Sequence, residues 1–187
     1  MGLFSFGSKK DKVRKMLEDN QIEVVVDQAM RDNKIVNALF ELLNEKNPGI
    51  VGDSLLALTD LMGKNKDVLM RNLKKENVLK CFSLIKARNP YVKENAMMFL
   101  GFLMRENPEI FMNFRKEVIQ GIKETIETGD KNDKAFALLM IREFKLSEFK
   151  SQVEELVNAE DKVILPFEGM KWVPLGDIAK ETLEKLR

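Results

Sequence analysis

Apolar residues recur three and four positions apart along most of the chain, the spacing that places side chains on one face of an α-helix. Two of the clearest runs are Val36, Leu39, Phe40 and Leu43, then Leu55, Leu58, Leu61 and Met62. Segments that contain helix breakers separate such runs, at 46–49, 63–67, 88–90, 107–109 and 129–133. The pattern predicts an all-α protein with helices of about ten to fifteen residues joined by short turns.

The chain also contains internal repeats. Residues 47–62 read NPGIVGDSLLALTDLM and residues 89–104 read NPYVKENAMMFLGFLM, and the two align without a gap at a period of 42. Within each, a small residue precedes apolar residues four and seven positions later, and this triplet recurs further on. The triplets are Ser54-Leu58-Leu61, Ala96-Leu100-Leu103, Ala137-Ile141-Phe144 and Ala179-Leu183-Leu186. A small residue lets a neighbouring helix approach closely while the larger residues fill the space between helices, so the recurrence predicts stacked helical units.

The repeats suggest how the chain is organised. We interpret residues 1–8 as an N-terminal tail and residues 9–187 as a single domain of about three to four repeats of 41–42 residues. The expected parts are an N-terminal cap (9–46), repeats (47–88, 89–129, 130–158), an inserted loop or small hairpin (159–174) and a C-terminal capping helix (175–187).

The unit NPYVKENAMMFLGFLMRENPEIF resembles the armadillo/HEAT family of helical repeats, and it is closer to armadillo. Ala96, Leu100 and Leu103 match the core of that family's Asn-Pro helix, and residues 107–109 match its Asn-Pro-Glu turn. Asn77 stands where armadillo repeats usually carry glycine, and asparagine tolerates the left-handed backbone conformation. The resemblance implies a right-handed α-solenoid whose units stack into a superhelix with a concave groove.

The resemblance also implies a binding strip along the Asn-Pro helices. In peptide-binding armadillo proteins, a Trp and an Asn on this helix grip an extended basic peptide. The Trp positions here hold Leu56, Met98 and Leu139, and the Asn positions hold Asp60, Phe102 and Glu143. Because the Trp–Asn ladder is absent, the strip is expected to suit an amphipathic helix or an apolar segment with a basic flank.

The helix at 90–105 is apolar nearly all round, which leaves two interpretations of its side chains. Met97 and Phe99 are expected in the core. For Met98 and Phe102, full burial and an apolar binding face both remain open.

Composition limits the chemistry. The 187 residues include no histidine and one cysteine, Cys81, which excludes His-based metal sites, Cys–His nucleophile pairs and thiolate zinc sites. Glycine-rich phosphate-binding motifs are absent as well. We therefore assign no catalytic, metal or cofactor-binding residues and expect a non-enzymatic protein. Cys81 is expected to be an inert core residue.

Positive and negative charges along the chain are nearly balanced. Lys+Arg total 31 and Asp+Glu total 30, a net charge of +1, whereas nucleic-acid-binding domains usually carry a basic excess. The single cysteine, the lack of an apolar run of about 18–20 residues and the lack of a secretory signal lead us to expect a cytoplasmic protein.

The sequence thus favours a protein-interaction adaptor or scaffold that binds a protein or peptide partner in the groove. One alternative is a HEAT-like module for nucleic-acid binding or repair. A second is a peripheral membrane-surface adaptor, since Leu3, Phe4 and Phe6 precede a Lys/Arg cluster at 9–15.

Overall fold

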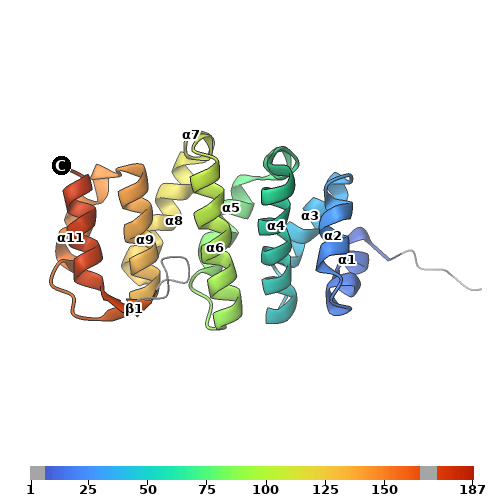
Figure 1. Cartoon of the computed structure of the whole chain (residues 1–187), viewed down its shortest axis with the longest axis horizontal. Helices are drawn as coiled ribbons and strands as arrows, with labels where there is room; N and C mark the ends of the chain where they lie inside the picture. Colours follow the sequence, from blue (N-terminus) through green and yellow to red (C-terminus); the bar gives the residue numbers. More distant parts are fainter. Residues whose placement is uncertain (1–6, 165–171) are drawn as a thin grey trace, which may run out of the picture.

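The computed structural model describes residues 7–164 and 172–187, and this part of the chain is all-α with one small pair of strands (Figure 1). The first half contains α1 (Lys9–Glu18), α2 (Ile22–Ala29), α3 (Asn33–Leu42), α4 (Pro48–Asn72), α5 (Lys75–Leu84) and α6 (Pro90–Glu106). The second half contains α7 (Glu109–Asn113), α8 (Arg115–Thr128), α9 (Lys131–Phe144), the 3₁₀-helix η1 (Ser147–Phe149), α10 (Lys150–Leu156) and α11 (Leu175–Lys185). The predicted all-α class is confirmed.

The helices form two rows along the long axis of the molecule. In one row α2, α4, α6, α9 and α11 follow one another, and α3, α5 and α8 lie behind them (Figure 1). Contacts join α2 to α4, α4 to α6 and α9 to α11 within the front row. Behind it α5 packs on α8, and α8 packs forward on α9. The hydrophobic core lies between the two rows.

Each front-row helix from α4 to α9 begins with the same kind of cap. Asn47 Oδ1 accepts a hydrogen bond from the Gly49 N–H (2.9 Å), and Asn89 Oδ1 accepts one from the Val92 N–H (3.3 Å). At α9 the cap is Asp130, whose carboxylate accepts from two backbone N–H groups. Such caps satisfy N–H groups that have no partner within the helix, so these positions determine where the helices start.

A bend recurs at the other end of these helices. Inside α4 the backbone leaves the helical region at Asn65 (φ −152°, ψ 78°). Asn107, 42 positions later, ends α6 with nearly the same dihedral angles (φ −136°, ψ 73°). The two helices therefore share a backbone bend at positions that are 42 residues apart.

The small-residue positions of the triplets line the interior. Ser54, Ala96, Ala137 and Ala179 are each at most 1% exposed. The large positions are buried too in the first two triplets, and burial of each such side chain contributes about 1.5–3 kcal/mol. Phe144 differs: it is half-buried and stacks on Phe111 of α7, with ring centroids 5.0 Å apart and an interplanar angle of 11°.

The expected core residues of α6 are buried, with Met97 at 2% and Phe99 at 0% exposure. Cys81 of α5 is also fully buried. The left-handed conformation suggested for Asn77 is wrong. Asn77 lies in the first turn of α5, where its Oδ1 accepts a hydrogen bond from the Lys74 N–H at 2.8 Å, so it caps a helix and does not end one.

The segment expected to be an inserted loop or hairpin contains β1 (Lys162–Ile164) and β2 (Trp172–Pro174). The strands pair antiparallel, with Val163 opposite Val173. Residues 165–171 of this segment lie outside the described residues, as do Leu3, Phe4 and Phe6 of the suggested membrane-binding tail.

Candidate functional site

The six predicted groove residues come from three successive helices of the front row. Leu56 and Asp60 belong to α4, Met98 and Phe102 to α6, and Leu139 and Glu143 to α9. Glu143 is exposed and the other five are partly exposed, so none of the six is a core residue. We call this set the α4–α6–α9 face. The question left open for Met98 and Phe102 is resolved in favour of partial exposure, because full burial is wrong for both.

A shallow hollow between α4 and α6 contains one of the six residues. Phe102 packs its inner side against the core and lines this hollow together with Thr59, Met62, Gly63, Lys66 and Glu106. An aromatic side chain that is held by the core and still reaches the surface is pre-ordered for contact with a partner.

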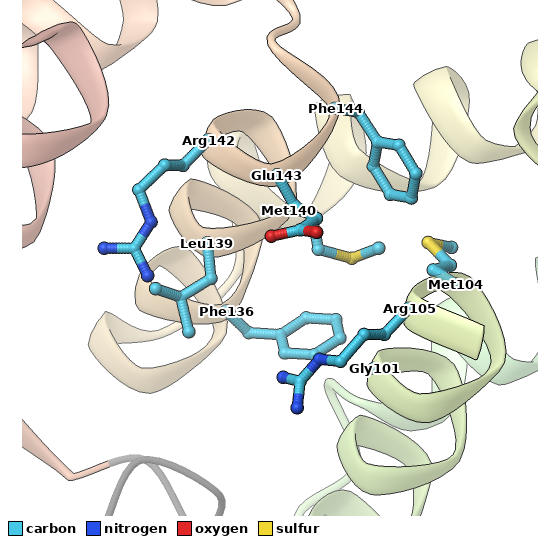
Figure 2. Close-up of a pocket in the computed structure, with 9 residues that line it drawn as sticks. All are labelled: Gly101, Met104, Arg105, Phe136, Leu139, Met140, Arg142, Glu143 and Phe144. Carbon is cyan, nitrogen blue, oxygen red and sulfur yellow. The ribbon is translucent and has the colours of Figure 1, made fainter. Parts of the chain in front are cut away.

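A second, smaller pocket lies between α6 and α9 (Figure 2). Two of its residues, Leu139 and Glu143, were predicted from the sequence. The others are Gly101, Met104, Arg105, Phe136, Met140, Arg142 and Phe144. Met104, Phe136 and Met140 are at most 5% exposed, so the interior of the pocket is apolar. Its cavity volume is about 60 Å³.

The pocket exists because α6 and α9 stand apart. In the described part of the chain these two helices lack the close backbone packing that joins α4 to α6 and α9 to α11. Gly101 contributes to the opening because it has no side chain there. A Cβ atom added at Gly101 would have Phe136 Cε2 as its nearest neighbour, at 3.9 Å.

Charged groups surround these apolar surfaces. Asp60 is paired with Lys64, 3.3 Å away, and Arg142 with Glu181, 2.9 Å away. Arg105 and Glu143 form no ion pair with any described residue. Asp60 is therefore partly neutralised. Besides the paired Arg142, the rim of the second pocket carries one cation, Arg105, and one anion, Glu143.

The described residues lack a metal-binding cluster, a reactive thiol and a membrane-spanning helix. Over residues 7–164 and 172–187, no group of three or more His, Cys, Asp or Glu could hold a metal ion. Burial raises the pKa of the Cys81 thiol to about 12, which removes this thiol as a nucleophile at neutral pH. None of the described helices combines the length and apolar character needed to cross a bilayer.

No protein-family model and no curated protein matches this chain. The case for a function therefore depends on the α4–α6–α9 face itself.

Sequence reasoning missed the glycine that opens the second pocket. Gly101 lies in the middle of a helix, where glycine is destabilising by about 1 kcal/mol relative to alanine. Such a glycine signals a close backbone approach or an open space, and this signal was available beside Phe102. Arg105 gave no comparable signal, because an arginine in the last turn of a helix is common.

Proposed function

We propose that the chain is an armadillo/HEAT-like α-solenoid that acts as a non-enzymatic interaction adaptor. In this proposal a peptide or helix of a protein partner binds along the α4–α6–α9 face, which forms the concave side of the superhelix. The recurring caps of α4, α6 and α9 and the matching bends at Asn65 and Asn107 support the repeat architecture.

One observation carries the binding proposal. Met98 and Phe102 remain partly exposed although they lie on a helix whose other apolar side chains are largely buried. They are one helical turn apart, and the hollow and the pocket lie on either side of their helix. Methionine adapts its shape to different partners, and aromatic residues contribute much of the energy at protein interfaces.

The two alternatives have weaker support. The α4–α6–α9 face holds Asp60 and Glu143 among apolar side chains, whereas a nucleic-acid surface needs a basic stripe. Near the N-terminus, Lys9 and Lys10 are paired with Asp32 and Glu45, which reduces the charge available to anionic lipids. A DNA titration at several salt concentrations and vesicle sedimentation with and without residues 1–6 test these alternatives directly.

A photo-cross-linking experiment tests the proposal. A photoreactive amino acid replaces Met98 in one protein and Met112 in a matched control, since Met112 is 79% exposed but lies on α7. After irradiation in native cell extract, we expect a discrete partner to be linked through position 98 and not through position 112.

A charged variant provides the second half of the test. For this variant the photoreactive amino acid is placed at Leu56 of α4, because position 98 is itself changed. Met98→Glu combined with Phe102→Glu should abolish the cross-linked product from position 56, while helical circular dichroism and cooperative melting stay close to wild type. Met112→Glu should leave the product unchanged. Retention of the partner by the folded double variant would contradict the proposal.

A further inference from the structure

The pocket between α6 and α9 has the size of one side chain. Its volume of about 60 Å³ is far below the roughly 300–1,000 Å³ of pockets that bind small molecules. Met104, Phe136 and Met140 form its interior. Transfer of an apolar group from water into such an apolar pocket is favourable. Its natural occupant is therefore an apolar side chain that belongs to a larger partner.

The charges on the rim of the pocket define the orientation in which a partner would bind. Besides the paired Arg142, each helix contributes one charge to the rim, Arg105 from α6 and Glu143 from α9 (Figure 2). Within the described residues neither charge has an ion-pair partner, whereas the neighbouring Arg142 is held by Glu181 at 2.9 Å. A partner that crosses from α6 to α9 thus meets a cation first and an anion second.

We infer that this pocket receives one apolar side chain of a peptide that places an acidic side chain against Arg105 and a basic side chain against Glu143. The inference rests on the proposed function and specifies the partner's chemistry and direction. A guanidinium group can bind a carboxylate through two parallel hydrogen bonds, which makes Arg105 a geometrically selective contact. Complementary charges at an interface determine register and exclude wrong orientations more than they raise affinity.

Peptide selection tests this inference without a known partner. A phage-displayed library of random peptides is selected against the full chain, and against a charge-swap variant that combines Arg105→Glu with Glu143→Arg. We expect the wild-type selection to enrich an apolar residue between an acidic and a basic residue in one order. The charge-swap variant should enrich the reverse order.

A synthetic peptide from the wild-type selection then allows affinities to be measured by fluorescence anisotropy. The charge swap should weaken its binding by about 3- to 10-fold, with the difference shrinking at high salt. Gly101→Leu fills the pocket and should weaken binding at least about 10-fold. Gly101→Ala is the matched control, since its added Cβ makes only an ordinary contact with Phe136 at 3.9 Å and should have a small effect.

The outcomes separate this inference from the proposed function. If selected peptides lose binding on Phe102→Glu but tolerate Gly101→Leu and the charge swap, the pocket inference is overturned and the groove proposal stands. If no selected peptide depends on the α4–α6–α9 face, both are overturned. Thermal melts check that the variants fold. If Gly101→Leu does not fold, the charge-swap variant alone tests the inference. An unchanged charge order in the peptides that it selects would overturn the inference.

Discussion

The Tyr91 hydroxyl donates a hydrogen bond to Asp53 Oδ1 at 2.7 Å, which joins the first turn of α6 to α4. The tyrosine ring also covers Gly52, where an added Cβ would lie 2.2 Å from two ring carbons. The α4–α6 junction is thus held by a polar contact at its edge as well as by its core.

This contact predicts the titration of the only tyrosine in the chain. Tyr91 is 41% exposed, and the partial desolvation of its ring, followed by the hydrogen bond to Asp53, raises the pKa of Tyr91 to about 12. A pKa raised in the folded state means that the contact contributes stability below the unfolded tyrosine's pKa, about 10, and loses it as pH rises toward 12. Ultraviolet absorbance of the phenolate should show this late titration, and Asp53→Asn should move it to lower pH. An identical titration in Asp53→Asn would contradict the assignment.

Two helical glycines should respond to alanine in opposite directions. At Gly121 a Cβ would lie 2.3 Å from Phe82 Cγ, and Phe82 is only 3% exposed, so its ring has little room to move. Gly121→Ala should therefore destabilise the fold by about 1–3 kcal/mol. At Gly63 no atom lies within 4 Å of the added Cβ, and Gly63→Ala should stabilise by about 0.5–1 kcal/mol. Urea unfolding of both variants measures the difference, and a shared sign would show that the packing argument is wrong.

The buried carboxylate of Asp133 should make the fold depend on Lys93. Lys93 Nζ lies 2.8 Å from Asp133 Oδ1 and also pairs with Asp130, while Asp133 is 2% exposed. Lys93→Met would leave this carboxylate without its cation, at a loss of about 3 kcal/mol at neutral pH. Lys123→Met removes only an exposed pair with Glu127 and should change stability by less than about 0.5 kcal/mol.

Acid should reduce the effect of Lys93→Met. Desolvation is the largest single effect on Asp130 and favours its protonated form. The hydrogen bond and charge of Lys93, together with the backbone N–H groups of Asp133 and Asn132, outweigh it and hold the Asp130 pKa below its usual value. A lowered pKa gives stability that is present above the unfolded value, about 3.9, and is lost as pH falls through the folded value. The stabilities of wild type and variant should therefore begin to approach each other as pH falls below about 3.9, and they should converge as pH falls through the lower folded-state pKa of Asp130. A constant difference across that range would rule out the ion pair as its cause.

The Cys81 thiol should report global unfolding. Since burial raises its pKa to about 12, iodoacetamide should not modify the native protein at pH values where an exposed thiol reacts readily. Urea should make the modification fast, with a midpoint that coincides with the loss of helical circular dichroism. Rapid labelling of the native chain, detected by mass spectrometry, would show that α5 opens locally.

The parts of the fold that depend on local patterns were predictable from the sequence. Helix starts follow from caps such as Asn47 and Asn89, and the buried small positions follow from helical spacing. Helical spacing placed Phe102 on the same stripe of the helix as Met98, but the sequence could not determine how far the Phe102 side chain is exposed. These features need only residues within a few turns of one another.

The rest depends on distances between helices. The pocket beside Gly101 requires that α6 and α9 stand apart, and the period of the triplets does not determine that separation. Asn77 was misinterpreted because its role as a helix cap depends on where α5 begins. Phe144 was expected to fill the space between stacked helices, yet it stacks on Phe111, which belongs to the short helix α7.

The separation of α6 from α9 has a mechanical consequence. At this junction close backbone packing between front-row helices is missing, and α6 and α9 meet mainly through side chains such as the Lys93–Asp133 ion pair. Behind them α5 packs on α8, and α8 packs on α9. A pull along the long axis would therefore strain the α6–α9 junction before the closely packed α4–α6 and α9–α11 junctions. Its front edge would open while its rear edge acts as a hinge. A ligand that bridges α6 and α9 would link the two helices directly and make the whole molecule stiffer along its long axis.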